Sequence, residues 1–308
     1  MPSKLSEPVS GSHPAPAPPL SAVLGALGER YPAAWAESWD AVGLVCGDPA
    51  APVRRVLFAV DPVRQVAEEA VAFGADLVIT HHPLYLRGTT TVAATGFKGR
   101  VLHTLIRAGE HGIALWTAHT NADSADPGVS DALAEAIGLR VTGPLVPDPT
   151  DPAGRRGTGR IGELPSAEPL AAFARRVAAG LPATAAGVRV AGDPERPIRR
   201  VAVCGGSGDS FFDQVRAAEV DAYVTADLRH HPASEAAEHS VPGDRPAPAL
   251  VDAAHWATEW PWLRLAEREL QQIAEKHGWQ LETRVSTQVT DPWTLHAPMP
   301  AAEAGPAA

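Results

Sequence analysis

Short apolar runs alternate with helical segments in the first half of the chain. Runs typical of buried strands cover residues 54–60, 76–80 and 113–118, and segments with helical periodicity, 63–74 and 99–112, lie between them. Alternation of this kind predicts an α/β fold with a largely parallel sheet. In such sheets, ligands bind beyond the carboxyl ends of the strands. The residues that follow these strands are therefore the first candidates for a functional site.

The strand motifs recur later in the chain. "RRVLFAV", which begins at Arg54, resembles "RRVAVCG", which begins at Arg199, and "DLVIT" from Asp76 resembles "DAYVT" from Asp221. In both cases the two copies are 145 residues apart. Equal spacing of two separate matches predicts two similar α/β halves with mostly parallel sheets, interleaved in sequence.

Two shorter matches involve histidines. "THH" at 80–82 resembles "RHH" at 229–231, and "TAHTNAD" at 117–123 aligns with "AAHWATE" at 253–259. Each of the longer motifs contains a histidine followed four residues later by an acid. These matches extend the repeat to residues that can carry chemistry.

Charge and composition restrict the classes of partner. The formal net charge of -10 argues against a general nucleic-acid binder, which needs clustered Lys and Arg, but it leaves a local basic patch open. Two cysteines are too few for a disulfide framework. The first residues contain no apolar signal core, and no run of about 18 apolar residues occurs, so we expect a soluble cytoplasmic protein with no membrane partner.

An adjacent pair of histidines, His81 and His82, follows the strand at 76–80. Neighbouring side chains of an extended strand point to opposite faces, so two adjacent imidazoles most easily serve two ions. His255 and Glu259, one helical turn apart, would share a helix face, and a carboxylate there could bridge both ions. Imidazole and carboxylate are ligands of Zn, Mn, Fe and Ni.

Each of these patterns also has an ordinary structural interpretation. Adjacent histidines are more often surface or partly buried residues, and a histidine four residues before an acid is more often a solvated or capping arrangement. His119 and Asp123 form a second such pair after the strand at 113–118. Because three such elements follow predicted strands, we favour a metal site over scattered histidines.

Two further segments invite a functional interpretation. "CGGSGDS" at 204–210 is a Gly-rich turn that could offer N–H groups to a phosphate, although a tight connection from strand to helix explains it equally well. In "WAESWDAVGLVCGD" at 35–48, Asp40 could orient a metal-bound histidine, and the alternative is a simple turn at Gly43.

Taken together, the motifs resemble the Ngg-interacting-factor-three-like family, also called the dinuclear metal-centre hexameric family or the GTP cyclohydrolase 1 type 2 homologues. The resemblance runs from about residue 20 to 280. The motifs that carry it are "SWDAVGLVCGD", "VITHHPL", "AHTNADSADPGVSDALAEAIGL", "GTGRIGEL", "RVAVCGGSG", "YVTADLRHH" and "DAAHWATE". It implies a toroidal homohexamer of two-domain α/β subunits, each with a two-metal site that faces an internal cavity.

The resemblance also implies the role of each ligand. His81 and His82 would bind one ion each, and Asp123 would share the ion of His82. His255 would share the ion of His81, and Glu259 would bridge the two. His119 and His231 match further positions that line the cavity and are not counted as firm ligands. The family usually has Tyr at the position of Trp256, which removes no ligand.

The expected domain organisation combines the repeat with this ligand set. Both ends of the chain are rich in Pro and Ala, a composition typical of disorder. We predict a disordered N-terminal tail at 1–20, a first α/β domain at 21–145 and 246–285 that carries the metal ligands, a second α/β domain at 146–245, and a C-terminal tail at 286–308.

These features together predict a hydrolase that depends on two divalent metal ions. Its substrate would be a nucleotide or another phosphorylated small molecule, with His119 or His231 transferring the proton. The alternative is a non-catalytic, metal-binding hexamer that stores or delivers metal or binds a partner protein. The sequence does not determine the metal or the substrate.

Overall fold

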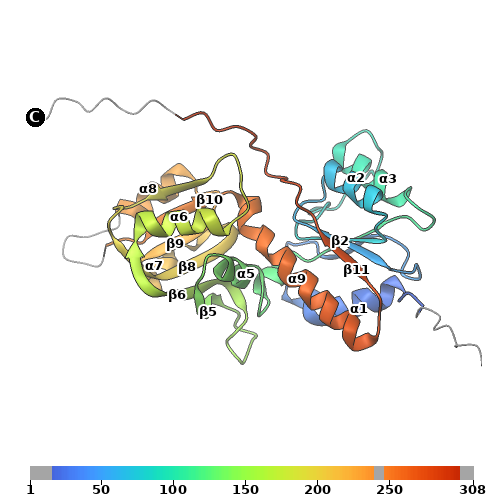
Figure 1. The fold of residues 1–308 in the computed structure, drawn as a ribbon, viewed down its shortest axis with the longest axis horizontal. Coiled ribbons are helices and arrows are strands. Elements are labelled where there is room, and N and C mark those ends of the chain that lie inside the picture. The colour runs from blue at the N-terminus through green and yellow to red at the C-terminus, as the bar shows by residue number, and fades with distance from the viewer. Residues whose placement is uncertain (1–15, 239–245, 299–308) are drawn as a thin grey trace, which may run out of the picture.

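The computed structural model describes residues 16–238 and 246–298, and its strands form two sheets (Figure 1). The first sheet has five strands in the order β1-β4-β3-β2-β11. Their bounds are β1 Gly43–Cys46, β2 Arg55–Ala59, β3 Leu77–Thr80, β4 Ala114–Thr117 and β11 Glu282–Val285. Only β1 pairs antiparallel, and the neighbours from β4 to β11 are parallel.

The second sheet has six strands in the order β5-β6-β8-β9-β10-β7. Their bounds are β5 Arg140–Pro147, β6 Gly157–Pro169, β7 Val188–Ala191, β8 Pro197–Ser207, β9 Ala222–Ala226 and β10 Ala249–Ala253. Parallel pairing joins β8, β9 and β10, and antiparallel strands flank them. The predicted α/β fold with two interleaved sheets is confirmed.

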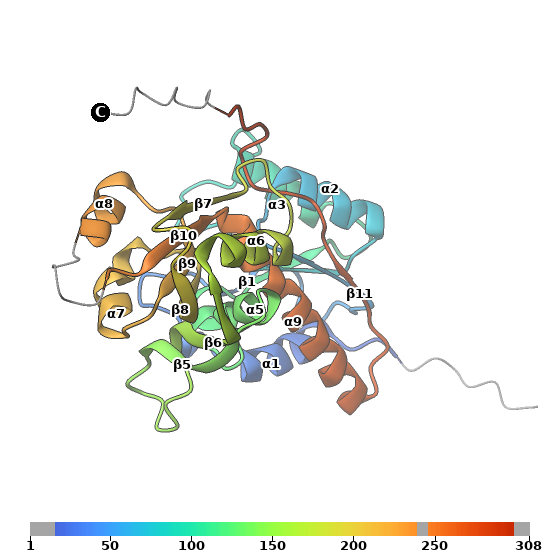
Figure 2. The ribbon, with the colours of Figure 1, turned by 60° about the vertical axis from the view of Figure 1, so that its left-hand side comes forward.

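Helices cover both sheets and fill the space between them (Figures 1 and 2). The α-helices are α1 Leu20–Arg30, α2 Arg64–Phe73, α3 Phe97–Ile106, α4 Thr120–Ser124, α5 Val129–Ala136, α6 Leu170–Gly180, α7 Phe212–Ala217, α8 His230–Glu238 and α9 His255–His277, and short 3-10 turns span Ala33–Trp35 and Asp209–Phe211. In the described part of the chain, no helix is both long and apolar enough to span a membrane.

The faces of the two sheets define three regions of core. Alternate residues of β2 and β3, such as Val56 and Leu77, face a central cluster shared with α1, α5 and α9, and the others face α2 and α3. In the second sheet, Val201 and Val224 join the same central cluster, and the opposite face packs on α7. Alternation of side chains across a strand explains why each buried strand serves two layers.

The predicted repeat is visible in the strand registers. Val56 of β2 lies opposite Leu77 of β3, and Val201 of β8 lies opposite Ala222 of β9. Residues 56 and 201, and residues 77 and 222, are each 145 apart, as in the sequence motifs. The repeated acids also make the same contacts. Asp76 Oδ2 accepts hydrogen bonds from the main-chain N–H groups at 54 and 55, and Asp221 Oδ2 accepts them from those at 199 and 200.

Three segments lie differently from the sequence expectation. β10, grouped with the first domain through the range 246–285, pairs instead with β9 and β7 in the second sheet. The range from 286 on, treated as a tail, begins by continuing the pairing of β11 with β2, since Ser286 donates its N–H to the carbonyl of Phe58. The expected N-terminal tail lies largely outside the described residues, and Leu20 is already buried in α1.

Candidate metal centre

Side chains from both sheets meet where β3, β4 and β10 end. His81 and His82 follow β3 directly, and His119 follows β4 at the start of α4. His255 is the first residue of α9, and Glu259 lies one turn further along it. Because β10 and α9 join the two sheets, residues from both halves of the chain converge on one place.

Glu259 lies at the centre of this cluster. Its Oε1 is 2.9 Å from His255 Nε2 and 3.4 Å from His81 Nε2, and its Oε2 is 3.0 Å from His82 Nε2. The Glu259 side chain is only 4 % exposed and that of His81 only 1 %. A buried carboxylate that faces three imidazoles is therefore the core of the candidate site.

Asp123 joins the cluster from α4, and its Oδ1 is 3.8 Å from His81 Nε2. His255 lies beside His82, with ring centroids 5.2 Å apart. These contacts favour a pairing opposite to the one that the resemblance implied, with Asp123 beside His81 and His255 beside His82. The reason is topological: α4 follows the strand next to β3, whereas His255 arrives from the second sheet.

The ligand atoms are close enough for two overlapping sites. In the described residues, two groups of three side chains have ligand atoms within 4.8 Å of one another: His81, His82 and His119, and His82, His255 and Glu259. His119, which sequence reasoning did not count as a firm ligand, thus lies within reach of one of these groups.

Each histidine of the cluster is oriented through its other ring nitrogen. The acceptors for Nδ1 are the Ala118 carbonyl for His81 at 3.0 Å, Asp61 for His82 at 2.7 Å, Asp40 for His119 at 2.8 Å and Asp227 for His255 at 2.6 Å. These oxygens only accept, so each Nδ1 donates. In neutral imidazoles this leaves the Nε2 lone pairs free, the arrangement found at metal-binding histidines.

The buried charges of the cluster shift the pKa values of its members. Burial raises the pKa of Glu259, but the surrounding histidines lower it well below its usual range. Burial lowers the pKa of His255, and Glu259 and Asp227 outweigh this effect, so the value is about 10. Burial raises the pKa of Asp123 to about 6. These directions describe a site that attracts positive charge.

Two buried atoms at the centre lack hydrogen bonds. His81 Nε2 and Glu259 Oε2 have no hydrogen-bond partner with suitable geometry, although Glu259 Oε2 lies 3.0 Å from His82 Nε2 and His81 Nε2 lies 3.4 Å from Glu259 Oε1. Unpaired buried polar atoms are costly and therefore rare. A divalent cation would satisfy both, and the mixed nitrogen and oxygen donors suit Zn, Mn, Fe or Ni. The residues present therefore fit bound metal.

Gly206, near the end of β8, makes room for Glu259. A Cβ atom there would lie 2.5 Å from Glu259 Oε1, and the φ angle of +71° also favours glycine. The N–H groups of Gly205 and Gly206 already donate to Ser130 and Thr258. Residues 204–210 therefore support the metal cluster, and these two N–H groups are not free to hold a phosphate.

Sequence reasoning missed two of the orienting acids and left a third open. Asp61 and Asp227 were not considered, although both lie just beyond the ends of buried strands, β2 and β9. Asp40 was weighed against a simple turn, and its carboxylate accepts from His119 and from Thr120. The signal that could have identified Asp61 and Asp227 was an acid just beyond the end of a buried strand.

His231 is not brought into the cluster. It is exposed on α8 and lines neither of the cavities that border the cluster. The match of "THH" with "RHH" explains the discrepancy. The sheet registers show that residues 225–227 of the second half are equivalent to residues 80–82 of the first. Asp227, not a histidine, therefore takes the position of His82.

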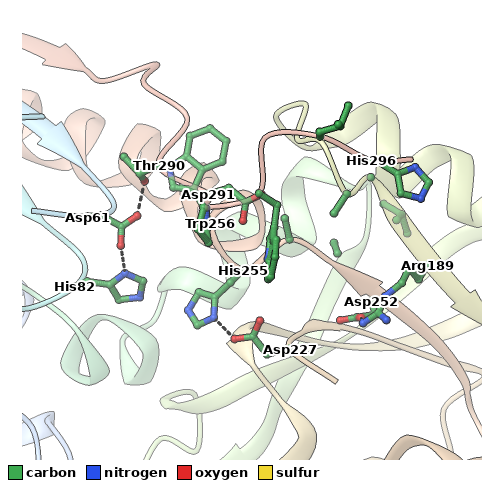
Figure 3. Close-up of a pocket in the computed structure, with 18 residues that line it drawn as sticks. Asp61, His82, Arg189, Asp227, Asp252, His255, Trp256, Thr290, Asp291 and His296 are labelled. Atoms are coloured by element: carbon green, nitrogen blue, oxygen red, sulfur yellow. Dashed lines mark hydrogen bonds and ion pairs between the residues drawn. The ribbon is translucent and has the colours of Figure 1, made fainter. Parts of the chain in front are cut away.

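Two cavities border the cluster, and His82 and His255 line both. The first, of about 750 Å³, is bounded by residues 290–296 near the C-terminus (Figure 3). The second, of about 710 Å³, is lined by His119, Glu259, aromatic residues and several hydroxyls. Trp39 in its wall is 58 % exposed and meets the His119 ring edge-on at 6.0 Å.

Known proteins match this chain over nearly its whole length. The family model for Duf34/NIF3 (NGG1p interacting factor 3) matches residues 19–292. A protein of Streptomyces coelicolor named GTP cyclohydrolase 1 type 2 homolog is 62 % identical over 91 % of this chain and 95 % of its own length. One of the same name in Mycobacterium tuberculosis is 38 % identical over 90 % and 97 %.

Solved structures show the same fold. A Bacillus cereus protein related to NIF3 superposes with a TM-score of 0.81 at 24 % identity, covering 91 % of this chain and 99 % of that one. A hypothetical protein of Staphylococcus aureus gives a TM-score of 0.80 at 27 % identity, covering 90 % and 99 %.

Proposed function

Because this chain belongs to the Duf34/NIF3 family, we propose that it is a hydrolase that depends on two divalent metal ions and acts on a nucleotide or another phosphorylated small molecule. The name of its relatives, GTP cyclohydrolase 1 type 2 homolog, suggests a nucleotide-related role. We also expect, from the family resemblance, a cytoplasmic homohexamer. Light scattering after size exclusion tests the oligomer.

One observation carries the proposal. Glu259 is buried among three imidazoles, and the Nδ1 atom of each donates a hydrogen bond to an oxygen outside the cluster. Two buried atoms at the centre have no hydrogen-bond partner. We propose His81, His82, Asp123, His255 and Glu259 as the ligands, with Glu259 between the two ions. When bound, such ions lower the pKa of water and polarise the bond under attack.

The chain itself would supply proton transfer through His119. Burial and the neighbouring His81 lower the pKa of His119 to about 4, so its imidazole is neutral at neutral pH. Asp40 accepts a hydrogen bond from Nδ1–H, which leaves Nε2 as a proton acceptor at the edge of the 710 Å³ cavity. The structure gives His231, the other sequence candidate, no place beside this cavity.

The lining of the 710 Å³ cavity supports a nucleotide as the substrate. Trp39 and Phe211 offer aromatic faces, and Thr150, Ser207 and Ser210 offer hydroxyls. Planar bases stack on aromatic side chains, and hydroxyl groups bind sugar or phosphate oxygens. The exposed ring of Trp39 next to His119 would hold a base close to the proposed ions.

A substrate screen tests the proposal. Protein loaded with Zn²⁺ or Mn²⁺ is incubated with GTP and other nucleoside phosphates, and the products are identified by mass spectrometry. We expect hydrolysis that His119→Gln abolishes while metal content is retained. If the metal-loaded protein hydrolyses no nucleotide or phosphoester, the hydrolase proposal fails and the non-catalytic metal-binding hexamer takes its place.

A matched pair of tryptophans tests the choice of cavity. Trp39→Ala should raise KM about tenfold because a stacking surface is lost. Trp293→Ala, in the wall of the other cavity, removes an exposed ring of the same kind and should leave KM unchanged. The opposite pattern would move the substrate to the other cavity.

A further inference from the structure

The cavity in Figure 3 is lined by an excess of carboxylates. Four acids contribute to its wall: Asp61, Asp227, Asp252 and Asp291. Among the described lining residues, Arg189 is the single Lys or Arg, and it pairs with Asp252. The remaining acids surround His82 and His255, the two histidines through which this cavity reaches the metal centre (Figure 3).

Asp291 is the least expected member of this group. It is only 8 % exposed, and its Oδ2 is buried with no hydrogen-bond partner. Asp227 and Asp61 line the same cavity, and burial and the charges of these two acids raise the pKa of Asp291. A buried, unpaired carboxylate oxygen beside two further acids is unfavourable unless positive charge reaches it.

The position of Asp291 is fixed by the segment that carries it. Residues 286–298, which we call the C-terminal strap, run from β11 past the end of β2 (Figure 1). Ser286 donates its N–H to the Phe58 carbonyl at 2.8 Å. Thr290 donates its hydroxyl to Asp61, whose other oxygen accepts from His82. The strap is thus tied to Asp61, the acid that orients His82, and it places Asp291 in the wall of the same cavity.

We propose that this cavity is an acidic vestibule that binds a divalent cation transiently and passes it to the metal centre, a role that rests on the proposed centre itself. Carboxylate oxygens attract hard divalent cations, and a cleft lined by one sign of charge raises both their local concentration and their rate of association. The vestibule acids are not among the converging groups of ligand atoms found in the described residues, which suits passage more than storage.

The two cavities would then have different roles. Cations would approach His82 and His255 from the vestibule, and the organic substrate would approach them from the aromatic cavity. Neither path would obstruct the other, because the two cavities share only His82 and His255 among their lining residues.

The rate of cobalt uptake tests the vestibule. Metal-free protein is mixed with Co²⁺, and the visible absorbance of the bound ion is followed for the wild type, Asp291→Asn and Glu37→Gln. Glu37 is the matched control, because it is an exposed acid in the wall of the other cavity. We expect the association rate to fall about three- to tenfold in Asp291→Asn alone. The dissociation rate should fall with it, so that Kd is unchanged.

Further measurements separate an effect on folding from an effect of charge. Asp291→Glu keeps the charge and should keep the rate, and an unchanged Tm excludes misfolding. Added NaCl should slow uptake by the wild type more than by Asp291→Asn. Equal rates in wild type and Asp291→Asn, or a changed Kd with an unchanged rate, would overturn the vestibule alone. A wild type that binds no Co²⁺ would overturn the metal centre as well.

Discussion

The end of β3 in the first sheet and the end of β9 in the second occupy equivalent positions of the repeat but carry different chemistry. At the end of β3 the chain reads Thr80, His81, His82, and at the end of β9 it reads Thr225, Ala226, Asp227. His82 faces Glu259 directly, whereas Asp227 accepts from Nδ1 of His255 and so orients a candidate ligand. One half supplies ligands at this position, and the other supplies their support.

The comparison shows which parts of the repeat the fold needs. The contacts of Asp76 and Asp221 with the preceding strand are the same in both halves, because they tie two parallel strands together. The residues beyond the strand ends do not tie strands together, and they differ between the two halves. The cluster needs both halves, since Glu259 lies between histidines from the first sheet and Gly206 from the second.

The largest effect on metal binding is expected from adding a side chain at Gly206, in the second half of the chain. Gly206→Ala places a Cβ atom 2.5 Å from Glu259 Oε1 at a φ of +71°, which costs about 1–2 kcal/mol in backbone strain alone. We expect metal affinity, measured by titration with Co²⁺, to fall at least 100-fold, about 2.7 kcal/mol.

Gly143→Ala in β5 is the matched control for this substitution, because a Cβ atom there meets nothing within 4 Å. It should leave both metal affinity and Tm near the wild-type values. Wild-type affinity in Gly206→Ala would show that the second sheet does not shape the centre.

An intermediate effect is expected from the two orienting acids. Asp61 holds His82 in the first half, and Asp227 holds His255 through the second. Asp61→Asn and Asp227→Asn should each weaken metal binding about 10- to 100-fold, as loss of such outer hydrogen bonds generally does. The measurement is again a Co²⁺ titration. A normal affinity in Asp227→Asn with a weakened one in Asp61→Asn would confine the centre to the first half.

The smallest effect on the metal is expected from the acids that both halves share. Asp76→Ala and Asp221→Ala each remove an acceptor of two main-chain hydrogen bonds. Each should lower the free energy of unfolding by about 1–3 kcal/mol. Metal content should stay the same in both. Unequal losses of stability in denaturant titrations would argue against the equivalence of the two halves.

The sequence predicted the strands and most of the cluster for a common reason. Short apolar runs such as 76–80 identify buried strands, and polar residues just beyond them collect at one edge of a parallel sheet. His81, His82 and Asp123 were therefore within reach of pattern reasoning, and His255 with Glu259 followed from helical spacing and the family resemblance.

The remaining features depend on long-range packing that no local pattern encodes. β10 joins the second sheet because it continues the parallel order of β8 and β9, and α9 then returns the chain to the first sheet. The pairing of His255 with His82 follows from that crossing. Asp291 looked like part of a tail, because only the folded strap brings it to the cluster.

The most direct test of the central claim is the metal content of each subunit, measured by elemental analysis of protein purified without a metal-affinity tag. We predict about two ions per chain in the wild type, as expected for a two-metal site, and a sharp loss in Glu259→Ala, which removes the shared carboxylate. A wild type without metal, or a Glu259→Ala variant with unchanged content, would contradict the dinuclear centre.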